Sequence, residues 1–378
     1  MTRKSILVVT RNYPPLNGGM ERLLKHSVES LSSQFDVTLI GPTGCSEFAP
    51  QGVETIECSP SPFFFLTMGL LKGWRASRKK SFDTVLGGSG LVAPVTLFLS
   101  RVARARSAIF VHGLDLVVEN WIYQRLFVPL LRHHDRLIAN SQNTRRIAID
   151  KGCQLSRVQV VHPGSTIPPD SLLRDVASIR ATLGFEENKV LLFVGRMVRR
   201  KGLAEFLEKA WPRIVETQPG AVLLVVGDSP DDALKRDSRS AQQLISLIKS
   251  YDDDAVRFMG SVSDETLWQC YAAADVLVFP LIRVKGDVEG FGMVAIEAAA
   301  CGTPTVAFSV GGVPDAVADG RSGILVAEGD YPAFAGAVDA VCNSAKPSAA
   351  ECSAHAQNFS WDVFGANLIS VLADDLEA

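Results

Sequence analysis

The sequence lacks the features that usually mark a metal-binding, secreted or membrane-spanning protein. Its seven cysteines are scattered and odd in number and never form a C-x-x-C pair, so neither a metal-ligand set nor a disulfide framework is indicated. No uninterrupted apolar run reaches the roughly 18 residues needed to cross a bilayer. The run that follows Arg3 and Lys4 is too short for a signal peptide. We expect a reduced cytoplasmic protein that is not integral to the membrane.

A strong excess of charge of either sign is also missing. The chain holds 38 Lys and Arg residues against 41 Asp and Glu residues, a net charge of −3. Dedicated nucleic-acid-binding proteins usually carry a strong basic excess, so we expect no nucleic-acid partner. The balance is nevertheless uneven. Residues 1–170 carry a net charge of +8 and residues 171–378 a net charge of −11.

Apolar residues, by contrast, are abundant. They make up 47% of the chain, and the mean hydropathy is +0.16, which is enough for well-packed cores and too apolar for disorder. Short β-branched runs alternate with helical segments, a pattern typical of parallel sheets covered by helices on both faces. The strands we expect are Ile6–Val9, Val37–Ile40, Thr84–Leu86, Ala108–Val111, Arg136–Ala139, Val158–Val161, Val190–Val194, Ala221–Val226, Val256–Phe258, Val276–Phe279 and Thr305–Ala307.

The length and one break in this pattern predict two domains. The chain has 378 residues, and typical domains have about 150. Prolines and a glycine interrupt the alternation over Pro163–Pro169, which we interpret as the linker. We therefore expect doubly wound domains over residues 1–166 and 167–355, each binding ligands at the carboxyl ends of its strands, and a C-terminal amphipathic helix within residues 356–378.

The first motif that carries chemistry follows the first expected strand. Two prolines precede Gly18 and Gly19, and a helix is expected from Met20. Glycines let the backbone approach a ligand closely, and the amides at a helix N-terminus favour anions. The loop matches neither the G-x-G-x-x-G pattern nor the phosphate loop of ATPases, so an ordinary strand-to-helix turn remains an equal alternative.

The second motif follows the first expected strand of the second domain. Gly195 lets the chain leave that strand sharply, and Arg196 and Lys201 then bring two cations to the strand's carboxyl end. A unit charge about 4 Å from a phosphate is worth roughly 4 kcal/mol before desolvation at an effective dielectric of about 20. We expect these two residues to bind phosphate, and Arg199 and Arg200 to be solvated residues of the turn.

The third motif runs from Glu289 to Glu297. Between these two acids, Gly290 and Gly292 leave bare amides at the start of a helix, which suits an anion. Eight residues at helical rise span about 12 Å, comparable to the reach from a sugar across a diphosphate to a ribose. A carboxylate can accept two hydrogen bonds from a vicinal diol, which accounts for an acid at either end.

These motifs together resemble glycosyltransferase family 4, whose members are retaining, nucleotide-sugar-dependent enzymes of GT-B fold. The resemblance rests on the spacing of Glu289 and Glu297, on the glycine-containing loops of the three motifs described above, and on the later Gly311–Pro314. All of them occur in the order typical of the family. It implies two Rossmann-like domains facing across a cleft. The N-terminal one would bind the acceptor and the C-terminal one the nucleotide sugar, and the last helix would return to the N-terminal domain.

The resemblance also assigns roles to individual residues. Glu289 would contact the donor sugar and Glu297 the ribose, while Arg196 and Lys201 would hold the diphosphate. His112, which follows an N-domain strand, would orient the donor near its anomeric carbon or bind the acceptor. We therefore expect catalytic roles for His112, Arg196, Lys201 and Glu289. The expected donor-binding residues are Gly18, Gly19, Arg196, Lys201, Gly260, Val262, Glu289, Phe291, Gly292, Met293 and Glu297.

We expect transfer to proceed without a metal ion or other cofactor. The sequence offers no convincing carboxylate pair in the first domain for a covalent intermediate. The resemblance implies instead that the acceptor attacks the face that the leaving group vacates, and that an oxygen of the diphosphate takes its proton. The protein would then neutralise the leaving diphosphate and position the sugar.

A basic, aromatic stretch in the first domain suggests where the acceptor is found. Eight basic residues and a single acid lie between Phe63 and Arg106, interleaved with apolar residues, as in helices that bind membrane surfaces. Trp121–Phe127 would add an aromatic anchor. We expect a lipid-linked or glycan acceptor of lipopolysaccharide, capsule or glycolipid synthesis, at the inner face of the cell membrane. A solvated basic helix is the alternative.

The donor sugar and the reaction class leave further alternatives. We lean to GDP-mannose or a GDP-deoxyhexose, although UDP sugars are also family donors. A metal-dependent transferase of the other major fold would need acidic ligands such as Asp231–Asp232 or Asp252–Asp254, which we expect to be polar loops. A GT-B sugar-nucleotide epimerase would convert donor without acceptor. A non-catalytic sugar-nucleotide-binding protein would show no turnover.

Overall fold

The computed structural model describes residues 3–169, 175–227, 243–248, 250–251, 255–344 and 347–377, with side chains up to residue 373. Both acidic pairs considered for a metal, Asp231–Asp232 and Asp252–Asp254, lie outside these residues. The chain forms two compact units. Unit 1 comprises Met1–Gly164 and Trp361–Ala378, and unit 2 comprises Ser165–Ser360. The sequence analysis expected the corresponding boundaries after residues 166 and 355.

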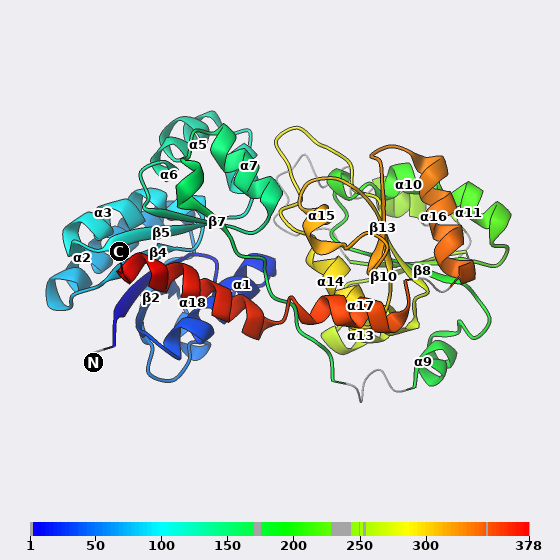
Figure 1. Ribbon diagram of the computed structural model, residues 1–378, viewed down its shortest axis with the longest axis horizontal. Coiled ribbons are helices and arrows are strands. Elements are labelled where there is room, and N and C mark those ends of the chain that lie inside the picture. The colour runs from blue at the N-terminus through cyan, green and yellow to red at the C-terminus, as the bar shows by residue number, and fades with distance from the viewer. Residues whose placement is uncertain are drawn as a thin grey trace. The chain divides into compact units, whose positions relative to one another are not determined.

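Unit 1 is built on a parallel sheet of seven described strands in the order β3-β2-β1-β4-β5-β6-β7 (Figure 1). The strands are β1 Ser5–Val9, β2 Asp36–Pro42, β3 Glu54–Cys58, β4 Thr84–Gly87, β5 Arg106–Val111, β6 Arg136–Ala139 and β7 Val158–Val160. The helices are α1 Gly19–Ser32, α2 Pro62–Lys79, α3 Ala93–Ala103, α4 Leu114–Val117, α5 Trp121–Leu126, α6 Val128–Leu131, α7 Gln142–Asp150 and α18 Trp361–Glu377, with short 3₁₀ turns at η1 Cys45–Glu47, η2 Gly90–Val92 and η3 Leu155–Arg157.

The strands of unit 1 are apolar on both faces because helices cover both. In β1, Ile6 and Val8 join the core formed with α1 and α18, while Leu7 and Val9 join the core formed with α2 and α3. Consecutive side chains of a strand point to opposite faces, so an unbroken apolar run fits a sheet covered twice. Figure 1 shows α18, in red, lying along α1, into whose core Phe364 and Leu368 pack.

Unit 2 repeats this architecture with six described parallel strands in the order β10-β9-β8-β11-β12-β13. They are β8 Val190–Val194, β9 Val222–Val226, β10 Val256–Gly260, β11 Val276–Phe279, β12 Thr305–Phe308 and β13 Gly323–Val326. The helical segments are α9 Val176–Leu183, η4 Arg199–Lys201, α10 Leu203–Lys209, α11 Trp211–Thr217, α13 Asp264–Ala273, α14 Met293–Ala300, α15 Val313–Ala316, α16 Tyr331–Ser344 and α17 Ala349–Gln357.

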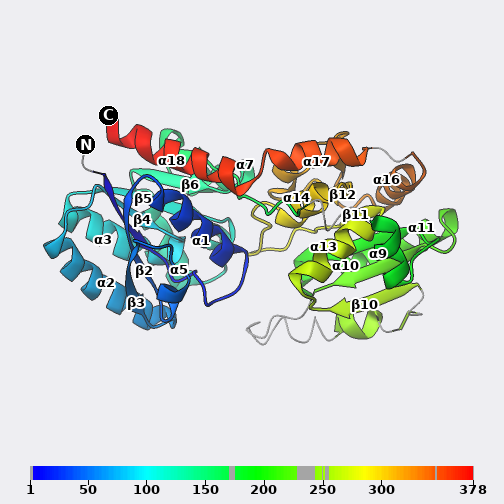
Figure 2. The same cartoon turned by 90° about the horizontal axis from the view of Figure 1, so that it is seen from below.

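The helices of unit 2 fall into two groups, one on each face of its sheet. Helices α10, α11 and α16 contact one another (Figure 1), and α14 contacts both α13 and α17 (Figure 2). One large apolar core surrounds the sheet between them. Each unit is therefore a doubly wound parallel sheet, as the sequence predicts. In the described part of the chain, no helix is both long enough and apolar enough to span a bilayer.

The sequence analysis missed two strands, and both lie at sheet edges. Strand β3 contains Glu54 and Glu57, and most of its residues are half-buried or exposed. Strand β13 begins at Gly323 and is half-buried at its centre. Edge strands need no unbroken apolar run, because one side of each faces no neighbouring strand. Strand β3 therefore lacks an apolar run of the kind that identified the other strands, whereas β13 contains one, Ile324–Val326, that was not assigned as a strand.

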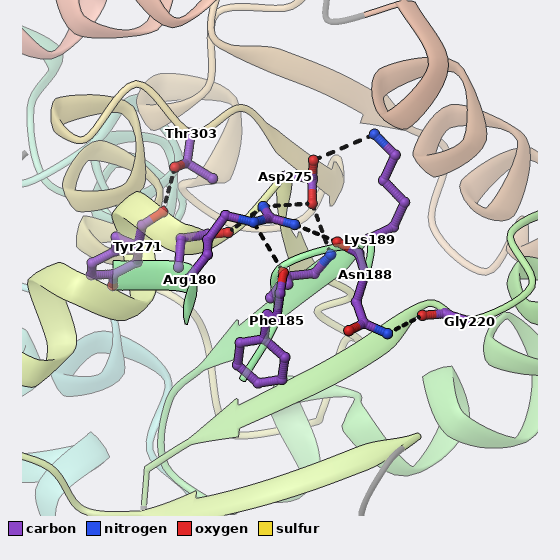
Figure 3. Close-up of polar contacts among 10 residues, drawn as sticks. Arg180, Phe185, Asn188, Lys189, Gly220, Tyr271, Asp275 and Thr303 are labelled. Carbon is purple, nitrogen blue, oxygen red and sulfur yellow. Dashed lines mark hydrogen bonds and ion pairs between the residues drawn. The ribbon is translucent and has the colours of Figure 1, made fainter. Parts of the chain in front are cut away.

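A polar network ties the amino ends of the central strands of unit 2 (Figure 3). The Asp275 carboxylate accepts from the amide of Val190 at 2.8 Å and from Arg180 Nη1 at 3.2 Å, and its other oxygen lies 3.6 Å from Lys189 Nζ. Val190 begins β8, and Asp275 immediately precedes β11. This network stabilises the edge of the sheet opposite to the carboxyl ends.

Candidate functional site

The strand order of each unit identifies where a ligand is expected to bind. In unit 2 the order reverses between β8 and β11, which are neighbours in the sheet. Open parallel sheets bind ligands outside the carboxyl ends of the strands at such a reversal. The loops that leave these two ends run from Gly195 to Gly202 and from Pro280 to Gly292. Both contain motifs singled out from the sequence.

These two loops are joined at the turn η4. The amide of Ile282 donates to the carbonyl oxygen of Arg200 at 3.0 Å. Gly202 has a positive φ of 70°, and a Cβ there would lie 1.9 Å from the carbonyl oxygen of Pro280. Any other residue would have to separate the loops. Gly202 thus holds the cations of η4 against the β11–α14 loop.

Four charged side chains meet where the loops join. Lys201 Nζ donates to Glu289 Oε2 at 2.8 Å, and Arg200 Nη1 donates to the same oxygen. Arg200 Nε also lies 3.0 Å from Asp287 Oδ1. Arg200 and Lys201 are 6% and 7% exposed, so these pairs are screened little by water. The expectation that Arg200 is solvated is wrong, because its two acidic partners lie on a loop far away in the sequence.

The cluster holds its acid strongly ionised. Burial alone would raise the pKa of Glu289, but the charges of Lys201 and Arg200 outweigh burial and lower this pKa to about 2. For Lys201, burial outweighs the attraction of Glu289, so its pKa is lowered. The charge of Arg196 contributes to that lowering, which indicates that Arg196 lies near Lys201.

Lys201 is directed at the carboxyl ends of the two central strands. A Cβ on Gly195 would meet the Lys201 side chain at 3.2 Å, and Lys201 Nζ lies 4.8 Å from the centre of the Phe279 ring. Gly195 follows β8 and Phe279 ends β11. Arg196 is exposed and directly follows Gly195, whose backbone lies against the Lys201 side chain. The two cations expected to bind phosphate are therefore brought together.

The glycine pair that follows β12 holds Glu289 in place. The amide of Gly312 donates to the carbonyl oxygen of Glu289 at 3.0 Å. A Cβ on Gly312 would lie 2.1 Å from the carbonyl oxygen of Gly290, so a side chain there would displace the loop. The Gly311–Pro314 motif therefore has a structural role. It anchors the backbone on which Glu289 is carried.

Helix α14 then begins directly after the Glu289 loop. Its N-cap is Gly292, with φ 107°, and the first turn contains no acid. Phe291 is 3% exposed and packs against the ring of Phe359, so its side chain belongs to the core and is not offered to a ligand. Met293 is half-buried at the first helical position. The helix start thus offers amides with a favourable dipole to an anion.

Glu297 lies further along α14 and is fixed by a tyrosine. It is 7% exposed, and its Oε2 accepts from the hydroxyl of Tyr271 at 2.9 Å. Tyr271 belongs to α13, and its carbonyl oxygen accepts from the Thr303 hydroxyl at 2.6 Å (Figure 3). This second contact ties α13 to the segment after α14. Sequence reasoning did not identify Tyr271, because its partner depends on how the helices pack.

Gly260 ends the edge strand β10, and Val262 follows it. Gly260 has a φ of 64°, and its carbonyl oxygen accepts from the amide of Gly227 at 2.9 Å. The amide of Gly195 donates to Val226 in turn at 3.0 Å. These bonds align the carboxyl ends of β8, β9 and β10. These two expected donor-binding residues therefore lie on the same sheet edge as Gly195.

The corresponding position in unit 1 lies between β1 and β4. Gly18 caps α1 and Gly19 begins it. A Cβ on Gly18 would lie 2.4 Å from Glu21 Oε2, and Glu21 Oε1 accepts from Asn12 Nδ2 at 2.7 Å. The start of α1 therefore already has a carboxylate beside it. Neither Asn12 nor Glu21 was expected to contribute.

His112 follows β5 and is held by two neighbouring loops. Its Nε2 lies 2.8 Å from the carbonyl oxygen of Gly88, and its amide donates to Asp115 Oδ1 at 2.9 Å. Asp115 Oδ2 also accepts from the amide of Gly90 at 3.1 Å. A carbonyl oxygen only accepts, so a neutral ring carries its proton on Nε2 and leaves Nδ1 as an acceptor.

The described side chains can supply charge and hydrogen bonds but offer no obvious metal site. Within the described ranges, no group of three or more His, Cys, Asp or Glu side chains is arranged to hold a metal ion. Unit 2 combines two cations, two fixed acids and a helix start, which suit a ligand with an anionic centre and flanking hydroxyls. The seven cysteines are unpaired thiols.

Family models match both halves of the chain. "Glycosyltransferase Family 4" matches residues 17–165, and "Glycosyl transferases group 1" matches residues 188–344. A D-inositol 3-phosphate glycosyltransferase of Streptomyces avermitilis is 30% identical over 344 residues, which cover 85% of this chain and 72% of that protein.

The chain belongs to glycosyltransferase family 4. The match to the equally named protein of Mycolicibacterium smegmatis is 35% identical over 237 residues and covers 60% of this chain. This match spans about half (50%) of the length of the Mycolicibacterium protein. The match to the equally named protein of Rhodococcus erythropolis likewise spans 51% of that protein.

Solved structures of low identity show that this family 4 glycosyltransferase has the GT-B fold. Anabaena HepE, determined with UDP and glucose, has a TM-score of 0.75 and 20% identity, and the match covers 98% of this chain and all of that one. Sucrose-phosphate synthase from Thermosynechococcus elongatus has a TM-score of 0.76 and 22% identity, with 99% and 100% covered. The fold expected from the sequence is confirmed.

The expected site residues of this glycosyltransferase form two groups. Unit 1 carries His112, Gly18 and Gly19, and unit 2 carries the others, which gather around the carboxyl ends of β8 to β11 and the start of α14. The residues that sequence reasoning missed are Asn12, Glu21, Asp115, Arg200, Tyr271 and Asp287. Each is polar and near a predicted residue, but each depends on a partner that only the fold reveals.

Proposed function

We propose that this family 4 glycosyltransferase moves a hexose, with retention of anomeric configuration and without a metal ion, from a nucleoside diphosphate to a hydroxyl acceptor. The observation that carries the proposal lies at the strand reversal of unit 2, where Lys201 and the α14 N-cap Gly292 both lie against Phe279 and the exposed Arg196 directly follows Gly195. Three sources of positive potential there suit a diphosphate leaving group. Glu289 and Glu297 flank them as acceptors for hydroxyl groups.

In the proposed reaction the bond between the anomeric carbon and the diphosphate oxygen breaks, and the acceptor oxygen bonds to the same face of that carbon. The acceptor's proton passes to the departing diphosphate. The products are the glycoside and the nucleoside diphosphate. Lys201 and Arg196 would stabilise the charge that grows on the leaving group, and His112 would orient the sugar through Nδ1.

Product analysis tests this proposal. Purified protein is incubated with a donor and acceptor panel, and the anomeric configuration of the product is read by proton NMR. We expect retention, and the same rate in the presence of EDTA. Inversion, or activity abolished by EDTA and restored by Mn²⁺, would contradict the mechanism. Conversion of donor without any acceptor would favour an epimerase, and binding without turnover a non-catalytic protein.

For the acceptor, we propose a lipid-linked glycan met at the inner face of the cell membrane. Helix α2 supports this, because it exposes Phe63, Phe64, Leu71 and Trp74, which are 39–69% exposed. Arg75, Arg78 and Lys79 follow Trp74 in the last turns of the same helix and are exposed as well, and Arg78 lies over the Trp74 ring. The neighbouring α3, which packs on α2, adds further exposed apolar and basic residues. Exposed aromatics with basic neighbours suit an anionic lipid surface.

Liposome flotation tests the membrane step. We expect the protein to bind vesicles containing anionic phospholipid at low salt, and not neutral vesicles. The double variant Arg75→Glu/Arg78→Glu should weaken binding by more than tenfold, since each basic residue near the surface contributes about 1 kcal/mol. Arg213→Glu, an exposed residue of unit 2, is the control. Equal binding by both variants would overturn the membrane proposal.

The donor and acceptor panel described above also identifies the donor and tests a second class of acceptor. A GDP hexose, GDP-mannose or a GDP-deoxyhexose, remains the preferred donor, and UDP-glucose is the main alternative. The relatives named D-inositol 3-phosphate glycosyltransferase favour a soluble phosphorylated polyol as a second acceptor. A thermal-shift screen with UDP-, GDP- and ADP-sugars identifies the donor, because only a bound nucleotide stabilises the folded state by mass action.

A further inference from the structure

Arg200 differs from the two other arginines of the same loop in being deeply buried. It is 6% exposed, whereas Arg196 and Arg199 are exposed. Burying an arginine is unfavourable unless acids compensate its charge. Asp287 and Glu289 do so. Two acids therefore bind an arginine to which no contact with the donor has been assigned above.

The contacts of Arg200 compete with those of Lys201. Both cations bind the same carboxylate oxygen, Glu289 Oε2. Within the described residues, Oε1 of that carboxylate has no such partner and remains available to a hydroxyl group. The shared oxygen means that the position of Glu289 is not set by Lys201 alone.

The charges in the cluster balance before any ligand binds. Arg200 and Lys201 contribute two positive charges, and Asp287 and Glu289 two negative ones. Without Arg200, Lys201 would be the single cation facing a buried Glu289 and would be held by it more strongly. An ammonium group held in that way is less able to turn towards a diphosphate.

We propose that Arg200 is a positioning residue that shares the Glu289 carboxylate with Lys201, and thereby leaves the Lys201 ammonium free to bind the diphosphate of the donor. This role rests on the proposed function, since it concerns the same diphosphate. It makes Arg200 act through Glu289 and Lys201 without touching the donor. Asp287 keeps Arg200 in place by binding Nε on its other edge.

A double-mutant cycle tests the proposal. UDP and GDP are titrated calorimetrically against the full chain and against Arg200→Gln, Glu289→Gln and the variant that combines the two. In the wild-type background, Arg200→Gln should weaken binding of the nucleoside diphosphate about tenfold. In the Glu289→Gln background the same change should have less than a twofold effect, because no carboxylate is left to hold Lys201.

Two further variants separate positioning from simple structural support. Arg200→Lys keeps a charge beside Glu289 and should restore most of the affinity. Arg199→Gln removes the exposed neighbouring charge and should leave affinity unchanged, so it controls for the general potential of the turn. Thermal unfolding of each variant verifies that it is folded.

The outcomes distinguish this inference from the proposed function. An equal loss of affinity from Arg200→Gln in both backgrounds would overturn the positioning role, and so would no loss in either. In both cases the nucleotide would still bind the wild-type chain, and the proposed function would stand. If neither UDP nor GDP binds the wild-type chain, the proposed function fails and this inference fails with it.

Discussion

The two units share one architecture but differ in the chemistry at the strand reversal. In unit 1, His112, Gly88 and Asp115 are joined by neutral or backbone hydrogen bonds, and the start of α1 already has the Glu21 carboxylate beside it. In unit 2, buried cations and acids meet beside a helix start that has no acid in its first turn. The same fold therefore supports two kinds of site, and the loops determine which.

The two units also differ in net charge. Unit 1, including α18, carries 20 basic and 15 acidic residues, and unit 2 carries 18 and 26. The net charges are +5 and −8. The acidic unit is thus the one that we expect to bind the anionic donor, which requires its few cations to be concentrated locally. Four predictions test this contrast, from the largest expected effect to the smallest.

Arg196→Ala should have the largest effect. The exposed side chain contributes no packing, so the protein should fold normally. Removing a charge that acts on the leaving group should lower the transfer rate by roughly a hundred- to a thousandfold. Steady-state kinetics measures this, with Arg199→Ala as the neighbouring control. A near-normal rate in Arg196→Ala would remove the basis for placing the leaving group in unit 2.

Acid should weaken unit 1 through His134. Burial lowers the pKa of this fully buried imidazole to about 4. The unfolded chain takes up a proton near pH 6.5 and the folded chain only near pH 4, so stability present above pH 6.5 is lost as the pH falls towards 4. Between pH 7.5 and 5 the loss is about 2 kcal/mol. In unit 2, the stabilisation from Glu289 persists down to lower pH, since its pKa is about 2.

Urea unfolding of the wild type and His134→Leu at both pH values measures this contribution. The variant should lose less stability on acidification, whatever its stability at pH 7.5. The same pH dependence in both proteins would show that His134 does not carry the effect.

His112→Asn should lower turnover by about tenfold while leaving nucleoside diphosphate affinity unchanged. The reason is that His112 belongs to the site of unit 1, whereas the proposed diphosphate contacts belong to unit 2. Kinetics and calorimetric titration of UDP and GDP together measure the split. A loss of nucleotide affinity similar to that of Arg196→Ala would break the contrast between the units.

Tyr271→Phe should have the smallest effect. It removes the hydrogen bond to Glu297, worth about 1 kcal/mol, and should raise the donor KM about fivefold with little change in kcat. Tyr251→Phe also removes a tyrosine hydrogen bond in unit 2, to the carbonyl of Leu207, and serves as the matched control. Equal KM changes in the two variants would indicate a general packing effect.

The sequence predicted the central strands because their apolar runs report burial on two faces. Ile6–Val9 and Val190–Val194 are such runs, and both are fully or nearly fully buried. Strand β3 was missed since Glu54 and Glu57 are tolerated at a sheet edge. The motif at Glu289 was visible because two glycines lie between two acids within nine residues. Local patterns of this kind need no knowledge of the fold.

The charge cluster itself could not be read from the sequence. Arg200 lies within Arg199–Lys201, which looks like an ordinary basic turn, and its partners Asp287 and Glu289 follow another strand far along the chain. Only the adjacency of β8 and β11 brings them together. For the same reason, the link between Tyr271 and Glu297 depends on the packing of α13 against α14. Local sequence patterns do not show which side chains far apart in the sequence contact one another.

One measurement tests the central claim directly, namely a crystal structure of the chain with a nucleoside diphosphate bound. The account predicts phosphate oxygens within hydrogen-bond distance of Lys201 Nζ and the Arg196 guanidinium, next to the first amides of α14. Arg200 should remain on Glu289. A diphosphate bound instead at Gly18 and Gly19 of unit 1, with Lys201 still on Glu289 Oε2, would contradict it.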